Sequence, residues 1–427
     1  MLKKVDLSFK FNQILRLRNK REPLLKWLSL FLYCTLLNKI FIGIPPEHYK
    51  PQHLCYNQPM QLKCLNNEKL YYIGGVVRDE ILNRPCFDID ITLEGNAIEF
   101  CKNLNLENFE ILQINDEFGT VRVRLNNEII DIASTRNETY PEKGHLPVVK
   151  DIGCSLKLDV LRRDFTINAI AKSVMTDEII DYTGGLEDIK SKKLRVLHDM
   201  SFVDDPTRIV RGLKFGVRFG FDLEEHTLDL QTKYLENVNY DMSFKRLKKE
   251  LVETFNLNKQ EAYEKFFYYK IYKLLSKNIP EKFDYDIENL INNHSVNNIW
   301  LVYLGYLNLD NLPLTKVEKK IVEDYQTLIT LKEPTSDYEI YKFFERCEPE
   351  SILIYIYTKN SEIGLRYFEI KDIKPAITGK NLIQVGYKPS KEFDNCFDYV
   401  LKSKLKEPNM SLDKEIELAK EYFANIS

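Results

Sequence analysis

The sequence predicts an α+β protein whose first part forms a sheet and whose second part is helical. Short apolar runs with alternating polar residues lie between residues 70 and 134, and glycine or asparagine pairs separate them, which is typical of strands joined by turns. From Asn256 onward, Tyr, Phe and Leu recur at helical spacing, which predicts helices around an aromatic core. A chain of 427 residues is long enough for roughly two to four domains.

Composition and charge restrict the protein class. Lys and Arg number 61 against 64 Asp and Glu, and the net charge of -3 means that any nucleic-acid contact must come from local basic patches. The eight cysteines include no C-x-x-C pair, which argues against structural zinc and fits a reducing cytoplasm better than a disulfide framework. We therefore expect a cytoplasmic protein.

Residues 1–59 form a predicted N-terminal extension of unknown role. The apolar run from Trp27 to Ile44 is broken by Asn38 and Lys39, so only about 11 apolar-rich residues are continuous, fewer than the roughly 20 that span a bilayer. We expect a docked helical extension and no membrane insertion. A misassigned start codon is the alternative interpretation.

The first recognisable structural unit begins at residue 70. Leu70–Ile73 is typical of a short buried strand, Gly74–Gly75 of a tight turn, and Val76–Leu82 of a short helix. Phe87–Leu93 follows as a second strand, in which side chains alternate between a buried and an open face. This alternation places the two aspartates of the strand together on the open face.

Two aspartates on one face of a strand suit a divalent metal. Asp88 and Asp90 offer the carboxylates that Mg2+ combines with phosphate oxygens and water, and two such ions can clamp the attacking and leaving oxygens of a phosphoryl-type displacement. Because Gly74 and Gly75 have no side chains, backbone N–H groups there can approach a triphosphate, with Arg78 as a charged donor one turn into the helix. The alternative is a solvated strand face beside an ordinary turn.

Strand, Gly-Gly, Arg and Asp-x-Asp in this order resemble the first motif of the polymerase-beta-like nucleotidyltransferases. The form Gly-Gly-x-Val-Arg-Asp at 74–79 is similar to the head of the class II tRNA nucleotidyltransferase and bacterial poly(A) polymerase family. The resemblance implies a head with a mixed sheet of about five strands, followed by an all-helical neck, body and tail. The implied domains are a catalytic head at 60–195, a neck for nucleotide-base and RNA binding at 196–255, a body at 256–370 and a tRNA-binding tail at 371–427.

The segments 119–125 and 128–134 alternate around an Asn-Asn turn and predict a hairpin. Asp131 lies on the polar face of the second strand, where it either completes a carboxylate triad or is an ordinary exposed residue. The resemblance implies only Asp88 and Asp90 as metal ligands.

Residues 135–147 have the Gly, Pro and polar content of a mobile loop. In the resembled family a flexible loop lies here and is tied to the switch from adding C to adding A. Its presence disfavours an enzyme that adds only C.

The segment 161–171 is close to the family's second motif, Arg-Arg-Asp-hydrophobic-Thr-hydrophobic-Asn-Ala. Its adjacent Arg162 and Arg163 can neutralise a triphosphate. Asp164 and Asn168 are four residues apart, and on one face of a helix they can bond ribose hydroxyls. The alternative is helix capping and surface charge.

A helix is predicted just after Asp205, which can therefore be an N-cap. Arg208 lies three residues later on the same face, and an acceptor beside a donor matches the pairing edges of both cytosine and adenine but not of guanine or uracil. Asp-Asp-x-x-Arg resembles the family's Glu-Asp-x-x-Arg motif, in which protein side chains act as the template. Further cations continue this face as a basic stripe: Arg211, Lys214 and Arg218.

In the tail, residues 373–390 resemble the signature Gly-x-Asp-Leu-x-x-x-Gly-x-x-Pro-Gly. Thr378 and Gly379 open a predicted helix, and with Lys380 and Lys388 nearby they can hold a tRNA backbone phosphate. A capped surface helix is the alternative.

The resemblance implies template-independent transfer of CMP and AMP from CTP and ATP to the 3′ end of tRNA, with two Mg2+ ions held by Asp88 and Asp90. The alternatives are an enzyme that adds only the terminal A, a poly(A) polymerase, and a catalytically silent RNA-binding module on the same fold. The predicted nucleotide-binding residues are Gly75, Arg78, Arg163, Asp164, Asn168, Asp205, Arg208, Arg211 and Lys214.

Overall fold

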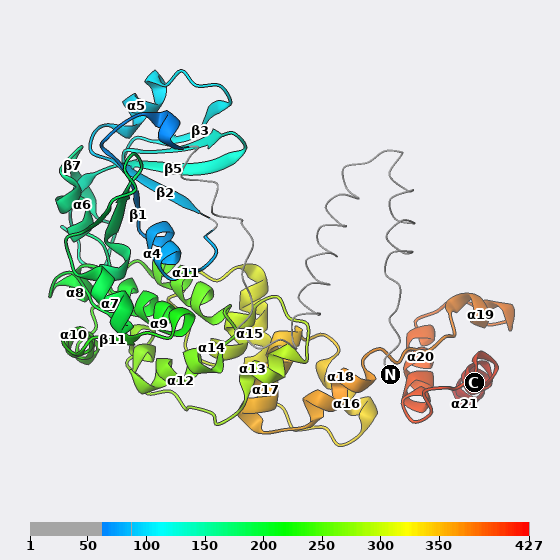
Figure 1. Ribbon diagram of the computed structural model, residues 1–427. Coiled ribbons are helices and arrows are strands. Elements are labelled where there is room, and N and C mark those ends of the chain that lie inside the picture. Colours follow the sequence, from blue (N-terminus) through cyan, green and yellow to red (C-terminus); the bar gives the residue numbers. More distant parts are fainter. Residues whose placement is uncertain (1–61, 87, 427) are drawn as a thin grey trace, which may run out of the picture. The chain divides into compact units, whose positions relative to one another are not determined.

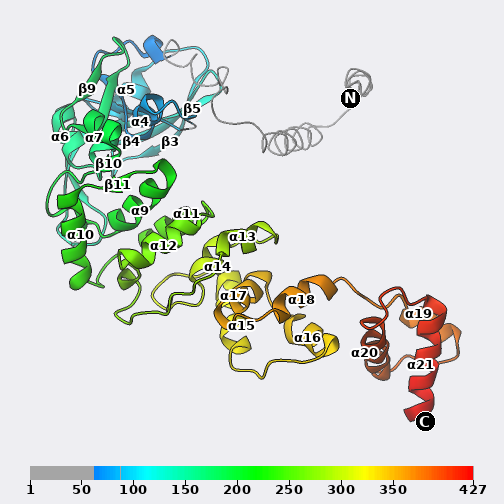
Figure 2. The ribbon, with the colours of Figure 1, turned by 60° about the horizontal axis from the view of Figure 1, so that its bottom comes forward.

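The computed structural model describes residues 62–86 and 88–426 (Figure 1). They belong to one compact unit that begins at Gln58. The predicted extension, residues 1–59, lies outside the described residues. The predicted α+β class is confirmed, because the strands are confined to the first part of the unit and helices alone follow (Figure 2).

A mixed sheet of seven strands, in the order β3-β4-β5-β2-β1-β8-β9, is larger than the sheet predicted. Its strands are β1 (Leu70–Ile73), β2 (Ile89–Leu93), β3 (Phe109–Asn115), β4 (Thr120–Leu125), β5 (Glu128–Ser134), β8 (Ile170–Ser173) and β9 (Ile179–Asp181). Sequence analysis missed β3 and β8. An irregularity between Ile111 and Gln113 interrupts the alternation in β3, and every residue of β8 is buried, so neither strand shows a clean period of two.

Strand β2 is fixed between β1 and β5. It pairs antiparallel with β1 and parallel with β5, where Asp90 lies opposite Asp131. The strand begins at Ile89, later than predicted, so Asp88 lies in the segment just before it. The predicted alternation is confirmed for the first three residues of the strand, because Ile89 and Ile91 are buried and Asp90 is exposed, but the last two residues are both buried.

Helices pack on the sheet and continue into the neck. Helix α4 (Gly75–Ile81) contacts β1, β2 and β8, and α5 (Ala97–Asn103) contacts β3, β4 and β5. Two small sheets join neighbouring segments: β6 (Arg136–Thr139) pairs with β7 (Val148–Ile152), and β10 (Lys193–Leu194) pairs with β11 (Asp222–Leu223). The remaining head and neck helices are α6 (Leu156–Leu161), α7 (Gly185–Ser191), α8 (Ser201–Asp204), α9 (Thr207–Phe219), α10 (Glu225–Glu236) and α11 (Phe244–Phe255), with 3-10 helices at Lys63–Leu65 and Thr166–Asn168.

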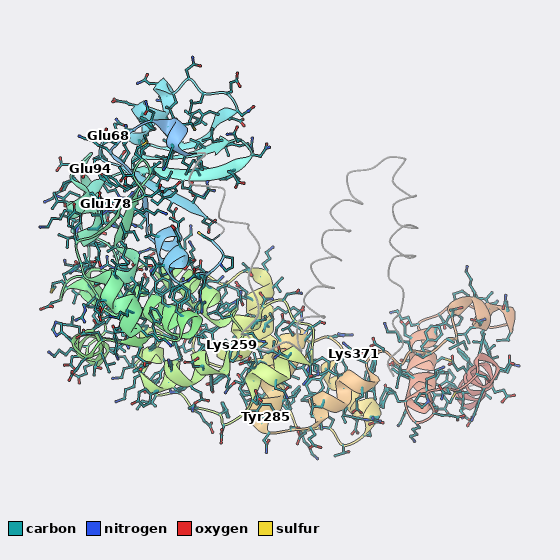
Figure 3. All side chains as sticks on the ribbon, viewed as in Figure 1. Glu68, Glu94, Glu178, Lys259, Tyr285 and Lys371 are labelled. Atoms are coloured by element: carbon teal, nitrogen blue, oxygen red, sulfur yellow. The ribbon has the colours of Figure 1, made fainter. Side chains whose placement is uncertain are left out.

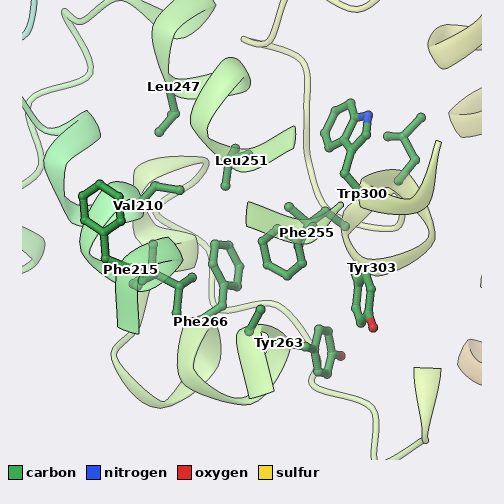
Figure 4. Packing of buried hydrophobic residues seen from close by; sticks show 14 of the residues in the cluster. Val210, Phe215, Leu247, Leu251, Phe255, Tyr263, Phe266, Trp300 and Tyr303 are labelled. Atoms are coloured by element: carbon green, nitrogen blue, oxygen red, sulfur yellow. The ribbon is translucent and has the colours of Figure 1, made fainter. Parts of the chain in front are cut away.

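One buried apolar cluster extends from the head through the neck into the body. Phe215 of α9, Leu251 of α11, Phe266 of α12 (Gln260–Tyr268) and Trp300 of α14 (Ile299–Leu304) all belong to it (Figure 4). The aromatic spacing after Asn256 therefore indicates core packing, as predicted. The other body helices are the 3-10 helix at Ile271–Leu274, α13 (Ile287–Asn292), α15 (Lys316–Leu328), α16 (Asp337–Phe344), α17 (Pro349–Lys359) and α18 (Ile363–Ile370).

The tail has a small core of its own, formed by α19 (Gly379–Gln384), α20 (Glu392–Lys404) and α21 (Leu412–Ile426). Thr378 and Asn381 make a reciprocal capping box at the start of α19, so the capped-helix interpretation describes this end of the helix. Lys380 and Lys388 are exposed beside it.

Helix α9 packs against α11 through buried ion pairs. Lys214 Nζ lies 2.6 Å from Glu250 Oε2 and 2.6 Å from Glu253 Oε2, and Arg211 Nη1 lies 3.1 Å from Glu250 Oε1. The predicted basic stripe is therefore corrected: Arg211 faces carboxylates of the head and the neck, Lys214 faces carboxylates of the neck, and only Arg218 at the end of the stripe is exposed. A sequence pattern shows the cations of one helix but not the partners on the next.

The carboxylates of Glu250 and Glu253 allow a matched test of these ion pairs. Glu250→Gln is expected to lower the free energy of unfolding by about 3 kcal/mol, because it leaves buried cations without their shared partner. Glu253→Gln, on the exposed side of the same helix, is expected to cost less than about 1 kcal/mol. Urea denaturation of both variants measures the difference, and equal losses would contradict the role given to Glu250.

Candidate active site

Asp90 lies in a crowded, negatively charged part of the sheet. Its side chain is open to solvent, yet the surrounding protein displaces enough water to raise its pKa above the usual value. The charges of Asp131 and Asp88 raise this pKa further, whereas Arg163 and Arg122 lower it. A cation bound here would relieve the repulsion between the carboxylates.

The donors at this place fit a divalent cation. Asp88 and Asp90 supply hard carboxylate oxygens, while Asp131 is bound separately by Arg122, whose Nε and Nη2 lie 2.8 Å and 2.7 Å from its two oxygens. In residues 62–86 and 88–426, no group of three or more His, Cys, Asp or Glu side chains has the arrangement of a metal site. The two predicted carboxylates thus remain the candidate ligands, and phosphate oxygens and water would complete the coordination.

The Gly-Gly turn lies against Arg163. Gly74 has φ of +76°, a backbone conformation that favours glycine, and a Cβ added there would lie 3.4 Å from Arg163 Nη1, which is ordinary van der Waals contact. Gly75, the first residue of α4, offers its N–H at the same turn. The structure therefore brings the predicted phosphate-binding turn and the second motif together.

The two adjacent arginines differ in their contacts. Arg162 donates to Asp159 through Nε and Nη2 and to Glu138 through Nη1, so its polar atoms face buried carboxylates. Arg163 donates to Asp159 through Nη2 at 2.9 Å, and its buried Nε has no hydrogen-bond partner within the described part of the chain. Helix α6, which carries Asp159, is fixed at its start by Glu94 (labelled in Figure 3), which accepts from the N–H of Leu156. Arg163 is thus the arginine with donors left for a ligand.

Arg78 lies inside the protein and not at an open phosphate site. It is buried, its Nε donates to Asp79 at 2.9 Å, and its Nη1 donates to Asn168 at 2.5 Å. The guanidinium also lies 4.5 Å from the ring centroid of Phe219, which is a cation–π distance. These contacts join the first helix of the head to the neck.

Asp164 and Asn168 bond one another, and the expectation of a continuous helix between them is corrected to a 3-10 turn at Thr166–Asn168. Asp164 is buried and accepts from Asn168 Nδ2 at 3.0 Å and from Arg211 Nη2 at 2.6 Å. Burial alone would raise the pKa of Asp164, but Arg211 and the Asn168 hydrogen bond hold it below the usual range. Any bond to a ribose would have to use the lone pairs and N–H groups that these contacts leave.

Asp205 lies two residues before helix α9, accepts from the first residue of that helix and also forms an ion pair. Its Oδ1 accepts from the N–H and the hydroxyl of Thr207, at 3.1 Å and 2.6 Å, and its Oδ2 accepts from Arg246. Arg208 is buried near it and donates to Ser201 Oγ at 2.7 Å and to Tyr140 Oη at 3.2 Å. The cap interpretation therefore describes one oxygen of Asp205 and leaves the other to be explained.

The predicted loop at 135–147 is partly a strand. Residues 136–139 form β6, and the turn that follows is fastened to the neck by backbone bonds of 3.0 Å from Gly144 N to Asp204 O and from Ser243 N to Gly144 O. Lys143 Nζ also lies 2.5 Å from Asp204 Oδ1. Neither β6 nor its pairing partner β7 alternates between buried and exposed residues, and both strands therefore escaped prediction.

Sequence analysis missed several residues that hold the site. Asp159 lies three and four residues before the paired arginines, a helical spacing that is a usable signal. Tyr140, Arg122 and Arg246 reach their partners from other elements, and no local pattern in the sequence indicates those contacts.

The contrast between Arg162 and Arg163 predicts opposite phenotypes. Arg163→Ala is expected to weaken binding of nucleoside triphosphates about tenfold or more, because it removes unshared donors. It should cost less stability than Arg162→Ala, because Asp159 loses only one bond and keeps both bonds to Arg162. Arg162→Ala is expected to lower the free energy of unfolding by about 3 kcal/mol, because buried Asp159 and Glu138 lose a partner. Equilibrium binding of labelled nucleotide and urea denaturation separate the two effects. Unchanged affinity in Arg163→Ala would contradict the phosphate role.

Comparisons with known proteins agree with this geometry. Residues 70–195 match the family model described as the poly(A) polymerase head domain. An A-adding tRNA nucleotidyltransferase of Aquifex aeolicus is 44% identical over 162 residues, which are 37% of this chain and 19% of that relative, so the chain spans about a fifth of that protein's length. An A-adding tRNA nucleotidyltransferase of Halalkalibacterium halodurans is 26% identical over 382 residues, 83% of this chain and 88% of that one.

Comparison of the fold with solved structures finds proteins of the same kind. A solved structure of the Thermotoga maritima CCA-adding enzyme complexed with tRNA matches with a TM-score of 0.70 and 26% identity, over 89% of this chain and 97% of that one. The head match, the full-length relative and the shared fold agree with the motifs at the Gly-Gly turn and at the paired arginines. In its head and in its fold the chain is similar to the class II tRNA nucleotidyltransferase and poly(A) polymerase family.

Proposed function

We propose that this protein transfers CMP and AMP from CTP and ATP to the 3′ end of tRNA without a nucleic-acid template. The observation that carries the proposal is the position of Asp88 and Asp90 in the same charged environment as Arg163, which itself lies against the Gly-Gly turn. Carboxylates for metal beside a cation for triphosphate are what nucleotidyl transfer requires. Relatives named for A addition and structures named for CCA addition, one of them complexed with tRNA, support this substrate class.

In this proposal Asp88 and Asp90 hold Mg2+, which supplies charge stabilisation at the RNA 3′-hydroxyl and at the pyrophosphate leaving group. Arg163 binds the triphosphate with the donors that Asp159 leaves, and the N–H of Gly75 lies at the same turn. The neck selects the base, and the tail, with exposed Lys380 and Lys388, holds the tRNA backbone.

Base choice follows from the chemistry of the pairing edges. Cytosine and adenine both present an amino donor beside a ring-nitrogen acceptor, which suits the carboxylate of Asp205 and the guanidinium of Arg208. Guanine and uracil present a carbonyl beside a ring N–H and would leave both protein groups unpaired, at a cost of roughly 1–3 kcal/mol each. Arg208 already bonds Tyr140 and Ser201, so its direction is fixed before a base binds.

Addition of only the terminal A is a second candidate, favoured by the names of the Aquifex and Halalkalibacterium relatives. Poly(A) polymerase activity is a third, consistent with the name of the head model. A silent RNA-binding module would have no chemical need for the paired aspartates. None of the helices between residues 62 and 426 that the structure describes is long and apolar enough to cross a membrane. We propose a cytoplasmic location because the scattered cysteines, without a C-x-x-C pair, fit a reducing compartment.

One assay separates these candidates. Transcripts of tRNA that end before C, after the first C and after CC are incubated with labelled CTP or ATP. Incorporation of C on the first two ends and of A on the third supports addition of C and A. Incorporation of A on the third end alone indicates A addition only, a long A tail indicates a poly(A) polymerase, and no incorporation on any end would contradict nucleotidyl transfer.

The paired aspartates can be tested separately from RNA binding. Asp88→Ala and Asp90→Ala are each expected to lower nucleotide incorporation by about two to three orders of magnitude, because charge stabilisation in the transition state is lost. Binding of tRNA should change little, since backbone contacts are made elsewhere. Asp131→Asn, whose parent carboxylate is bound by Arg122, serves as the control and should lose much less activity. Normal turnover in either alanine variant would contradict the metal role.

A further inference from the structure

The carboxylate of Asp205 has a partner outside its own helix. Asp205 is 4% exposed, and its Oδ1 accepts from the N–H and hydroxyl of Thr207, the first residue of α9, in the manner of a cap. Its Oδ2 accepts from Nη2 of Arg246, in the first turn of α11. Capping alone gives no reason for a second, charged donor on a carboxylate that is already bonded.

Arg246 makes a second contact from the same guanidinium. Nη1 lies 3.3 Å from the backbone oxygen of His145, in the turn that follows β6. The backbone bond from Ser243 N to Gly144 O brings that turn to the start of α11. One side chain therefore bridges the Asp205 carboxylate and the turn after β6.

From these contacts we propose that Arg246 is a positioning residue that sets nucleotide selectivity by orienting Asp205. The inference rests on the proposed function, in which Asp205 accepts the amino group of cytosine or adenine. A planar guanidinium on Oδ2 holds the plane of the carboxylate, so the remaining lone pairs point in one direction. Without Arg246 the carboxylate keeps its bonds to Thr207 but turns about them, and its acceptor loses a defined direction.

Arginine is required for this geometry. Its separate Nη atoms can reach the carboxylate and the His145 carbonyl at once, whereas a lysine ammonium is a single point charge without a planar fork. Because the Arg246 side chain is 28% exposed and the Asp205 side chain only 6%, the pair is bonded mostly inside the protein, where hydrogen bonds have more effect. Arg246→Lys should therefore retain stability better than it retains selectivity.

The test measures incorporation of all four nucleoside triphosphates on one tRNA acceptor. For Arg246→Gln, incorporation of UTP and GTP relative to CTP and ATP is expected to rise about tenfold, because the bond that discriminates between the bases is no longer oriented. Arg246→Lys should show a smaller rise in the same direction at nearly unchanged melting temperature. Lys245→Gln, which removes the neighbouring exposed charge, should leave the ratio unchanged.

The outcomes distinguish this inference from the proposed function. Selective incorporation by the wild-type protein together with unchanged selectivity in both folded Arg246 variants would overturn the role of Arg246 alone. Absence of incorporation by the wild-type protein would overturn the proposed function and, with it, this role. An equal rise in Lys245→Gln would show a general effect of charge and would also overturn the inference.

Discussion

Pairing of buried charges is the constraint on which the site depends. Arg211 bonds Asp164 on one side and Glu250 on the other, and Glu250 also bonds Lys214. A buried charge that loses its partner costs several kcal/mol, so each of these groups restricts the position of the next. Helix α9 cannot turn about its axis against α11 or the head without breaking at least one pair, and its N-terminal end, which we propose reads the base, is held accordingly.

The same network of bonded side chains continues to the Gly-Gly turn, which we propose binds the triphosphate. Asn168 donates to Asp164 and accepts from Arg78, which belongs to the helix that begins at the Gly-Gly turn. The turn proposed for the triphosphate and the helix proposed for the base are therefore connected by consecutive bonded side chains. In the proposed function, a rigid spacing between the two would hold the base at a fixed distance from the reacting phosphate, which is the entropic advantage of a preorganised site.

The sequence predicted the parts of this arrangement that local rules control. The period of two in β2 was enough to place Asp90 on the open face, and the order of motifs was enough to indicate the head. Strand β8 was missed because a fully buried strand has no alternation. The apparent basic stripe of α9 was misread because its carboxylate partners on α11 lie 36 to 39 residues away in the chain. Local patterns show which side of an element is polar, but only tertiary structure shows whether that polarity is already satisfied.

In the proposed function, satisfied polarity is also what would allow side chains to replace a template. An arginine without partners could move to bind the phosphate of any nucleotide, so its position would not depend on which base is bound. Arg208, bonded to Ser201 and Tyr140, and Asp205, bonded to Thr207 and Arg246, have few directions left in which to accept or donate. A base that does not match those directions must either stay unpaired or break bonds inside the protein, and both cost free energy. Selectivity in such a site therefore comes from the contacts behind the reading groups as much as from the reading groups themselves.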